Sequence, residues 1–182
     1  MTTFLDYLSL NETGLNLLNK SDVMKACHLI ENTAKNNGVI WTAGNGGSAS
    51  TASHAQCDLS KGVSESAAIN IRAVCLNDLM PLLSAWENDF GHEEAIVNIC
   101  KTHVQINDLL LLISGSGNSS NIINAANWAR ENNIQSITLT GFDGGRLRSL
   151  GTCSIHVPIQ DMQVVENLHL VIIHYFLKFF EK

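Results

Sequence analysis

The sequence predicts an α/β fold in which a doubly wound parallel sheet is flanked by helices. Short apolar segments alternate with segments of helical periodicity along the whole 182-residue chain. Two of the apolar segments lead directly into glycine- and serine-rich turns, and each turn opens a helix. Strands that are separated by helices pair in parallel, with helices covering both faces of the sheet.

The first half of the chain contains the first two strands. Apolar residues recur at helical spacing over residues 11–36, with a break and a new N-cap at Ser21 and Asp22. An Asn-Asn-Gly sequence ends this segment, and a short buried strand follows at 38–42. The pattern predicts further elements as a helix at 48–61, a strand at 69–76 and helices at 79–87 and 92–105.

The second half repeats the alternation. It predicts an apolar strand at 109–113, a helix at 118–131, a strand at 134–139, a glycine-rich turn at 141–145 that leads into a short helix, a strand at 153–157 and a long helix at 161–181. No linker or low-complexity segment interrupts the chain, so one domain over residues 1–182 is expected.

The composition narrows the class of protein. An apolar fraction of 45% is typical of a globular domain, and a net charge of −6 without a basic cluster argues against nucleic acid or an anionic membrane as a partner. The five cysteines form no C-x-x-C pair, which argues against a disulfide framework or a zinc knuckle. Because the start of the chain resembles no signal peptide and no apolar run could span a bilayer, we expect a cytoplasmic protein.

The two glycine- and serine-rich turns indicate a phosphorylated ligand. The first covers residues 43–48 and the second covers residues 114–120. Glycine lets the backbone approach an anion, the free N–H groups at a helix start favour negative charge, and serine hydroxyls add donors. The first turn departs from the dinucleotide fingerprint, since no acidic residue closes a second strand about 20 residues later. No G-K-[ST] sequence follows either turn, so neither is a Walker loop.

Two pairs of residues carry candidate chemistry. His54 and Asp58 are four residues apart on one helical face. Glu166 and His174 are eight apart, about 80° around a helix, so both can face one cleft, whereas His169 points elsewhere. Each pair alone is typical of an ordinary surface contact. Together, two imidazoles and two carboxylates could form a four-ligand zinc site or an acid–base set that moves a proton.

These features in combination resemble the sugar isomerase (SIS) domain, and within it the phosphoheptose isomerase subfamily. The resemblance covers essentially the whole chain, in the right order. It rests on the segments 44–49, 88–91, 114–119 and 139–145, on His54 six residues after Ser48, and on Glu166 and His174 in the last helix.

The resemblance implies a flavodoxin- or Rossmann-like three-layer sandwich. It also implies a homotetramer with active sites at subunit interfaces, to which the N-terminal helices (about 1–36) contribute contacts. The implied reaction interconverts sedoheptulose 7-phosphate and D-glycero-D-manno-heptose 7-phosphate by metal-assisted proton transfer through an enediol or enediolate. One Zn²⁺ per active site is expected.

The resemblance also assigns roles to residues. It implies that zinc is held by His54, Asp58, Glu166 and His174, of which Asp58 and His174 are also the catalytic acid–base residues. The residues implied in binding the sugar and its phosphate are Asn45, Gly46, Gly47, Ser48, Lys61, Asp89, Ser114, Ser116 and Ser119.

The chain departs from the family pattern at three positions. Asp58 stands where the family usually has glutamate, Glu166 where it often has glutamine, and Gly62 where it has a phosphate-binding arginine. Lys61 is adjacent and is the expected substitute for that arginine.

Two other functions fit the same sequence. One is a non-catalytic SIS-domain protein that binds sugar phosphates as a regulator, or a replication-initiator protein as an adaptor. The other is an isomerase of a different sugar phosphate. Because such adaptors typically lack the late-helix histidine, the presence of both His54 and His174 favours an enzyme.

Overall fold

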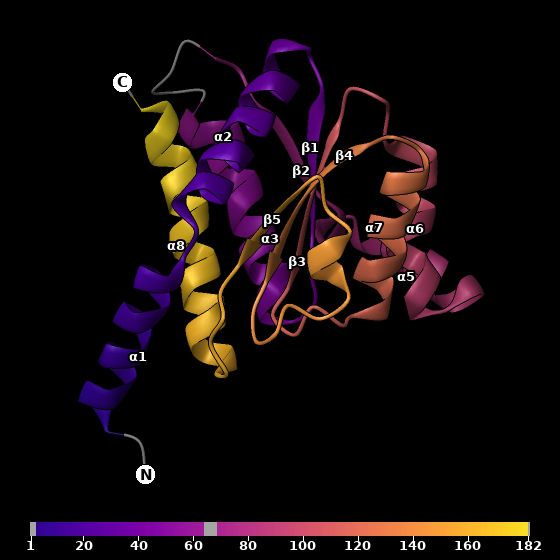
Figure 1. The fold of residues 1–182 in the computed structure, drawn as a ribbon. Helices are drawn as coiled ribbons and strands as arrows, with labels where there is room; N and C mark the ends of the chain where they lie inside the picture. Colours follow the sequence, from indigo (N-terminus) through magenta and orange to yellow (C-terminus); the bar gives the residue numbers. More distant parts are fainter. Residues whose placement is uncertain (1–2, 64–68, 182) are drawn as a thin grey trace.

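The computed structural model describes residues 3–63 and 69–181, which form a five-stranded parallel sheet covered by helices on both faces (Figure 1). The strands lie in the order β2-β1-β3-β4-β5. Their bounds are β1 Val39–Ala43, β2 Arg72–Cys75, β3 Leu109–Ser114, β4 Gln135–Thr140 and β5 Cys153–His156. The predicted α/β class and the doubly wound parallel sheet are confirmed.

The chain order reverses at β1, because its two neighbours in the sheet are β2 and β3. Thr42 near the end of β1 pairs with Cys75 on one side and with Leu111 on the other. Ligands of doubly wound sheets bind in the crevice at the carboxyl ends of the strands, at the point where the strand order reverses. The two glycine- and serine-rich turns follow β1 and β3, so both open at this crevice.

Seven α-helices are described along the chain. Their bounds are α1 Phe4–Leu17, α2 Lys20–Lys35, α3 Gly47–Cys57, α5 Met80–Phe90, α6 His92–His103, α7 Ser120–Glu131 and α8 Met162–Phe180. Three short elements complete the fold, namely a π-helix η1 at Asp58–Val63 and two 3₁₀ helices, η2 at Leu76–Asp78 and η3 at Leu147–Ser149.

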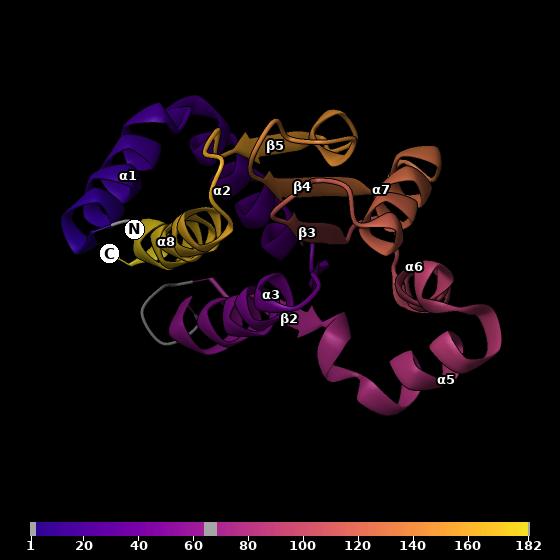
Figure 2. The same ribbon diagram turned by 90° about the horizontal axis from the view of Figure 1, so that it is seen from below.

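Two apolar layers hold the helices on the sheet. Every residue of β3 is buried, and its side chains alternate between the layers. Leu111 belongs to the layer under α2, α3 and α8, and Leu112 to the layer under α5, α6 and α7. Figure 2 shows these helix groups on opposite faces of the sheet. Each fully buried leucine stabilises the fold by roughly 1.5–3 kcal/mol relative to exposure.

A buried carboxylate just before β3 fixes the start of β1. Asp108 is 6% exposed and accepts hydrogen bonds from the Val39 backbone N–H (2.7 Å), the Trp41 indole N–H (2.9 Å) and the Gln105 backbone N–H (2.9 Å). These three donors offset the cost of burying the charge. The contact ties the two central strands together at the end opposite the crevice.

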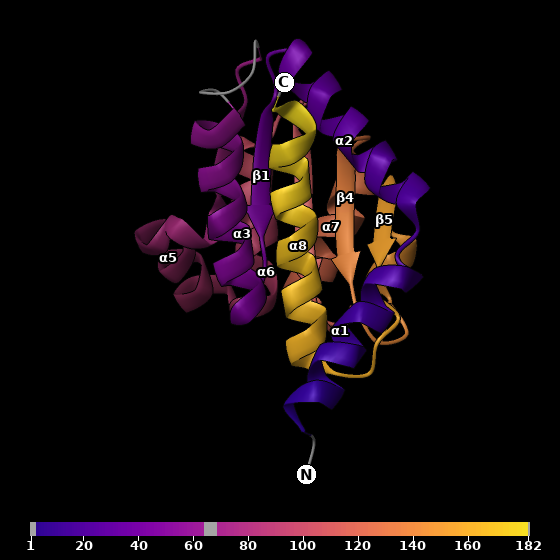
Figure 3. The ribbon, with the colours of Figure 1, turned by 90° about the vertical axis from the view of Figure 1, so that its left-hand side faces the viewer.

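The helix α8 is central to one face of the molecule. It lies between α3 on one side and α1 and α2 on the other (Figure 3). Val164, Val165, Leu168, Ile172, Ile173 and Phe176 on this helix are buried in the layer under α8. This packing places the functional side chains of α8 next to those of α3.

Several predicted boundaries were wrong. The first helix starts at Phe4, where Thr3 and Asp6 form a capping box, rather than at residue 11. The break falls at Leu18 and Asn19, and Asn19 caps α2 in place of the predicted Ser21–Asp22 cap. The predicted strand at 69–76 is reduced to β2, and the predicted helix at 48–61 divides into α3 and the π-helix.

The predicted domain bounds 1–182 include residues 1–2, 64–68 and 182, which lie outside the described residues. Among the helices of the described ranges, none combines the length and the apolar character that crossing a membrane requires.

Candidate active site

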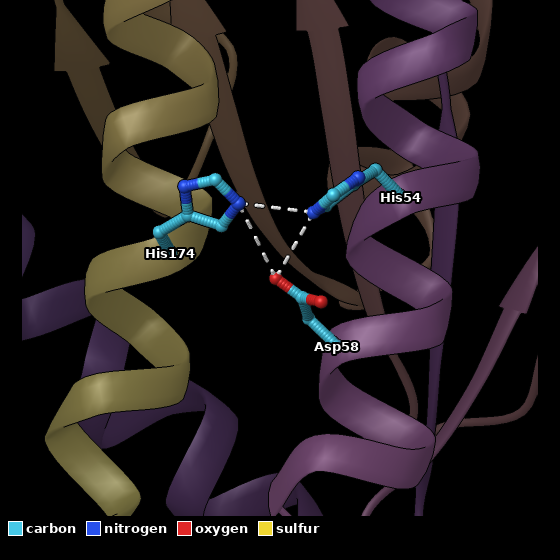
Figure 4. Close-up of side chains that lie close together, drawn as sticks. All are labelled: His54, Asp58 and His174. Carbon is cyan, nitrogen blue, oxygen red and sulfur yellow. Dashed lines mark hydrogen bonds and ion pairs between the residues drawn. The ribbon is translucent and has the colours of Figure 1, made fainter.

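Three predicted site residues come together between α3 and α8. The Nε2 atoms of His54 and His174 are 3.0 Å apart. Oδ2 of Asp58 lies 3.3 Å from Nε2 of His54 and 3.9 Å from Nε2 of His174. Figure 4 shows both imidazoles directed at this one carboxylate oxygen, while the second oxygen of Asp58 points away from them. We call His54, Asp58 and His174 the imidazole–carboxylate cluster.

Local structure explains why the cluster forms. His54 is in the last turn of α3, and Asp58 begins the π-helix that continues it, so the two side chains share one face. π-Helical turns within α-helical segments are frequent at functional sites. Gly62 in this π-helix packs against Leu177 of α8, where an added Cβ would collide with the leucine side chain. The missing side chain therefore lets the π-helix approach α8 closely.

The environment of the cluster is suited to holding a cation or a proton. The Asp58 side chain is only 16% exposed, and its Oδ2 makes no hydrogen bond to any described residue. The His54 and His174 side chains are 43% and 51% exposed, so the cluster opens to solvent on one side. A buried carboxylate oxygen faced by two imidazole nitrogens is costly unless a positive charge is shared among them.

The three atoms also fit a metal ion by chemistry and spacing. Nitrogen and oxygen ligands at about 2.0–2.2 Å from a tetrahedral zinc ion are about 3.3–3.6 Å from each other. The separations of 3.0, 3.3 and 3.9 Å in the cluster bracket that value. Three protein ligands with one open position are the usual set of a catalytic zinc site. His54, Asp58 and His174 would therefore hold the ion.

Glu166 does not join this group. Its carboxylate lies beside Gly47, in the first turn of α3, where a Cβ on Gly47 would collide with it. Glu166 precedes His174 by two helical turns, or about 12 Å along the axis. The small angle between Glu166 and His174 around the helix therefore does not bring them together, because this rise separates them.

The first predicted binding turn is held by side-chain amides. Gly46 adopts a positive φ of 54°, and Ser48 is buried in the first turn of α3. The Asn45 amide exchanges two hydrogen bonds with the Asn121 amide, at 2.8 and 2.9 Å. Asn77 holds Gly44 from the other side, since its Nδ2 donates to the Gly44 carbonyl (2.9 Å) and its Oδ1 accepts from the Gly44 N–H (3.1 Å).

The second turn brings its serines together. The hydroxyl oxygens of Ser114 and Ser119 are 3.1 Å apart, and Ser116 Oγ accepts from the Asn118 backbone N–H at 3.2 Å. Gly46, the N-cap of α3, has no side chain, and Ser119, the N-cap of α7, makes no side-chain cap hydrogen bond. Both helix starts therefore present backbone N–H groups that are suited to an anion.

The two remaining predicted binding residues lie away from the turns. Lys61 is exposed in the π-helix, less than one turn beyond Asp58. Asp89 is at the end of α5, which packs on the opposite face of the sheet from α8 (Figure 2). Within one chain, Asp89 is therefore not brought to the imidazole–carboxylate cluster.

Sequence reasoning missed Asn77 and Asn121. Asn77 contacts a residue 33 positions away, and Asn121 contacts a residue 76 positions away. No local spacing indicates such pairs. The one available signal was the position of each asparagine at the carboxyl end of a predicted strand or the start of a predicted helix.

Comparison with known proteins places this geometry in a family. The SIS domain family matches residues 8–141. The phosphoheptose isomerase of Helicobacter pylori (strain ATCC 700392 / 26695) is 34% identical over 150 residues, which cover 82% of this chain and 78% of the relative. That of Aliarcobacter butzleri (strain RM4018) is 33% identical over 150 residues, with 82% and 79% covered.

A solved structure agrees with these relatives. The phosphoheptose isomerase from Neisseria gonorrhoeae superimposes with a TM-score of 0.88 at 26% identity, and the match covers 97% of this chain and 94% of that one. Fold, site and sequence similarity lead to one conclusion: this chain belongs to the phosphoheptose isomerases, a family of isomerases built on the SIS domain.

Proposed function

We propose that this protein interconverts sedoheptulose 7-phosphate and D-glycero-D-manno-heptose 7-phosphate. The observation that carries the proposal is the imidazole–carboxylate cluster between α3 and α8, in a chain with the phosphoheptose isomerase fold. Two turns suited to phosphate follow β1 and β3 in the same chain. Aldose–ketose isomerisation requires a base that takes a proton next to a carbonyl and an acid that protonates the oxygen.

Different residues of the chain bind the substrate and transfer the proton. The two turns bind the sugar phosphate, with Ser48, Ser114, Ser116 and Ser119 as hydroxyl donors and Asn45 and the backbone of Gly46 and Gly47 beside them. Lys61 contributes a positive charge and Asp89 positions substrate from a neighbouring subunit. Asp58 moves the proton between C1 and C2, and His174 is the partner acid–base group.

The dimensions support a long, open-chain substrate. His54 is six residues, or about 9 Å along the helix axis, from Ser48. An extended seven-carbon sugar with a terminal phosphate spans a similar distance, about 10 Å from C1 to phosphorus, when each of its eight bonds advances by roughly 1.3 Å. One molecule could therefore reach from the turns to the cluster.

Zinc is the proposed cofactor, one ion per active site, held by His54, Asp58 and His174 with the fourth position open. Glu166, the fourth ligand that the family resemblance implies, is separated from this cluster by the rise of about 12 Å along α8. When bound, such an ion polarises a carbonyl oxygen and stabilises the negative charge that develops on it.

The proposed location is a reducing cytoplasm. All five cysteines are free thiols, which agrees with this location.

Self-association is part of the proposal. Phe4 and Leu5 on α1 are each 73% exposed, and a groove of about 480 Å³ between α1, α2 and α8 is lined mainly by apolar side chains. Exposed apolar surface of this kind is typical of an interface. We propose a homotetramer with the N-terminal helices in its contacts. A native mass of one chain in light scattering would contradict it.

Turnover of sedoheptulose 7-phosphate tests the proposal. The purified protein is assayed as isolated, after chelation and dialysis, and after zinc is restored. We expect formation of the aldoheptose phosphate, its loss on chelation and its recovery with zinc, because the cluster supplies three metal ligands.

The other outcomes identify the alternatives. Turnover of a shorter sugar phosphate alone would indicate an isomerase of different specificity. No turnover and no bound metal would favour a non-catalytic binding protein.

A further inference from the structure

A pair of side-chain amides joins the two binding turns. Asn45 follows β1 and Asn121 is in the first turn of α7, which follows β3. Asn45 Nδ2 donates to Asn121 Oδ1 at 2.8 Å, and Asn121 Nδ2 donates to Asn45 Oδ1 at 2.9 Å. We infer that Asn121 is a positioning residue, which orients Asn45 toward the sugar phosphate without touching the substrate itself. This inference rests on the proposed function of the same site.

The orientation of Asn45 is set by the start of α7. The Ile122 backbone N–H donates to Asn121 Oδ1 at 2.9 Å. This bond determines which end of the Asn121 amide is oxygen, because only an oxygen can accept it. The reciprocal pair then determines which end of the Asn45 amide is the donor. Asn45 therefore cannot flip without losing both hydrogen bonds.

Burial makes the hydrogen bonds between Asn45 and Asn121 costly to break. Asn121 is 1% exposed, so water cannot replace a lost hydrogen bond at low cost. Asn45 is only partly buried, and each amide has two donor hydrogens and two acceptor sites. After pairing, Asn45 keeps one N–H and one acceptor site. These are the groups that we expect to meet a substrate hydroxyl.

A double-mutant cycle tests the inference. We expect Asn121→Ala to reduce kcat/KM for the sugar phosphate by roughly tenfold or more, since two hydrogen bonds to Asn45 are lost. In an Asn45→Ala background, the same change should reduce kcat/KM by less than about twofold, because Asn121 would act only through Asn45. Equal effects in both backgrounds would overturn the inference.

A matched control comes from the same helix. The Asn124 amide donates to Glu93 O (3.0 Å) and Glu94 Oε1 (3.1 Å) on α6, away from both turns. Asn124→Ala should change kcat/KM by less than about twofold. If it matches Asn121→Ala, disturbance of α7 explains both results and the inference fails. Should Asn121→Ala not fold, Asn121→Asp replaces the bond donated to Asn45 Oδ1 with a carboxylate oxygen that cannot donate, and unaltered kcat/KM in this variant would overturn the inference.

The unfolding transition separates this test from the proposed function. The same four proteins of the cycle are unfolded in urea, and a coupling between positions 45 and 121 is expected in their midpoints whether or not the protein turns over the heptose phosphate. If the wild-type protein is inactive but shows this coupling, the proposed function is wrong and the positioning role of Asn121 stands. An active wild-type protein without coupling in either measurement would overturn the positioning role alone.

Discussion

At the scale of single residues, the carboxylate of Asp58 explains how an aspartate can stand where the family usually has glutamate. The side chain is one methylene shorter, yet its Oδ2 lies 3.3 Å from His54 and 3.9 Å from His174. Asp58 begins the π-helix, and Gly62 in that helix packs directly on Leu177 of α8. This close packing of the two helices offsets the shorter reach of the carboxylate.

Replacing either acid–base residue should abolish most activity. We expect Asp58→Asn and His174→Gln each to lower kcat by about 10²–10⁴-fold, the usual contribution of general acid–base catalysis. Both substitutions preserve side-chain size, so the thermal unfolding midpoint should stay near that of the wild-type protein. Steady-state kinetics and thermal unfolding on the same samples provide the measurement.

A histidine outside the cluster is the control for these variants. His92 is exposed and pairs with Glu87 at 2.8 Å near the α5–α6 junction. His92→Gln should leave kcat unchanged. Near-normal kcat in Asp58→Asn or in His174→Gln would rule out the assigned roles.

Residues of the site were predictable to different degrees. His54 and Asp58 are four apart in one helix, so their contact follows from helix geometry. The approach of His174 from α8 depends on tertiary packing. The residue types suggested that the two pairs form one site, and the family resemblance supported this grouping. The pairing of Asn45 with Asn121 spans 76 positions and depends on the strand order, so no pattern in the sequence could reveal it.

At the scale of elements, the two binding turns differ in how tightly they pack. Gly46 and Gly117 both have a positive φ, of 54° and 67°. An added Cβ at Gly46 would meet no atom within 4 Å, whereas one at Gly117 would collide with the Gly144 carbonyl of the 141–145 turn. The second binding turn is therefore packed against backbone, and the first has open space beside it.

This difference predicts unequal effects of two alanine substitutions. Gly46→Ala should cost about 1–3 kcal/mol, the cost of holding an L-residue at the backbone conformation of Gly46 (φ 54°, ψ −123°). Gly117→Ala should cost about 1–3 kcal/mol more, because the backbone of the neighbouring turn has to move. Urea unfolding of both variants and the wild-type protein checks the order. A smaller loss for Gly117→Ala than for Gly46→Ala would contradict this account of the second turn.

The order of elements was predictable, and several of their ends were not. The alternation of apolar segments with helical segments predicts the order of strands and helices, because strands buried on both faces of a parallel sheet are continuous apolar runs. The π-helix at Asp58–Val63 overlaps the end of the predicted helix 48–61, because about one π turn is too short to show a spacing of its own in the apolar pattern. The start of α1 was missed because Phe4, Leu5 and Leu8 are exposed and bury no face in this chain.

At the scale of the whole molecule, one buried histidine links stability to pH. His169 on α8 is 1% exposed, and burial lowers its pKa from 6.5 to about 4. Burial also lowers the pKa of His156 on β5, to a lesser degree. Between pH 6.5 and pH 4 the unfolded chain therefore binds a proton at position 169 that the folded chain does not.

The sign of the pH effect follows from this difference. Because the unfolded state binds more protons in that range, the free energy of unfolding falls as the pH falls. The contribution of His169 is absent above about pH 6.5 and reaches a loss of about 3 kcal/mol near pH 4. We expect urea unfolding of the metal-free protein, at one protein concentration, to show this loss between pH 7 and pH 4.

Two variants attribute the loss to His169. His169→Leu removes the titrating group, so its free energy of unfolding should decline less steeply with falling pH than that of the wild-type protein, whatever its stability at pH 7. His28→Gln, at an exposed position on α2, should keep the wild-type slope. The other histidines, including those of the imidazole–carboxylate cluster, are common to the wild-type and His169→Leu proteins, so the difference in slope isolates one buried side chain. Equal slopes in these two proteins would mean that position 169 takes up its proton in the folded state as readily as in the unfolded state.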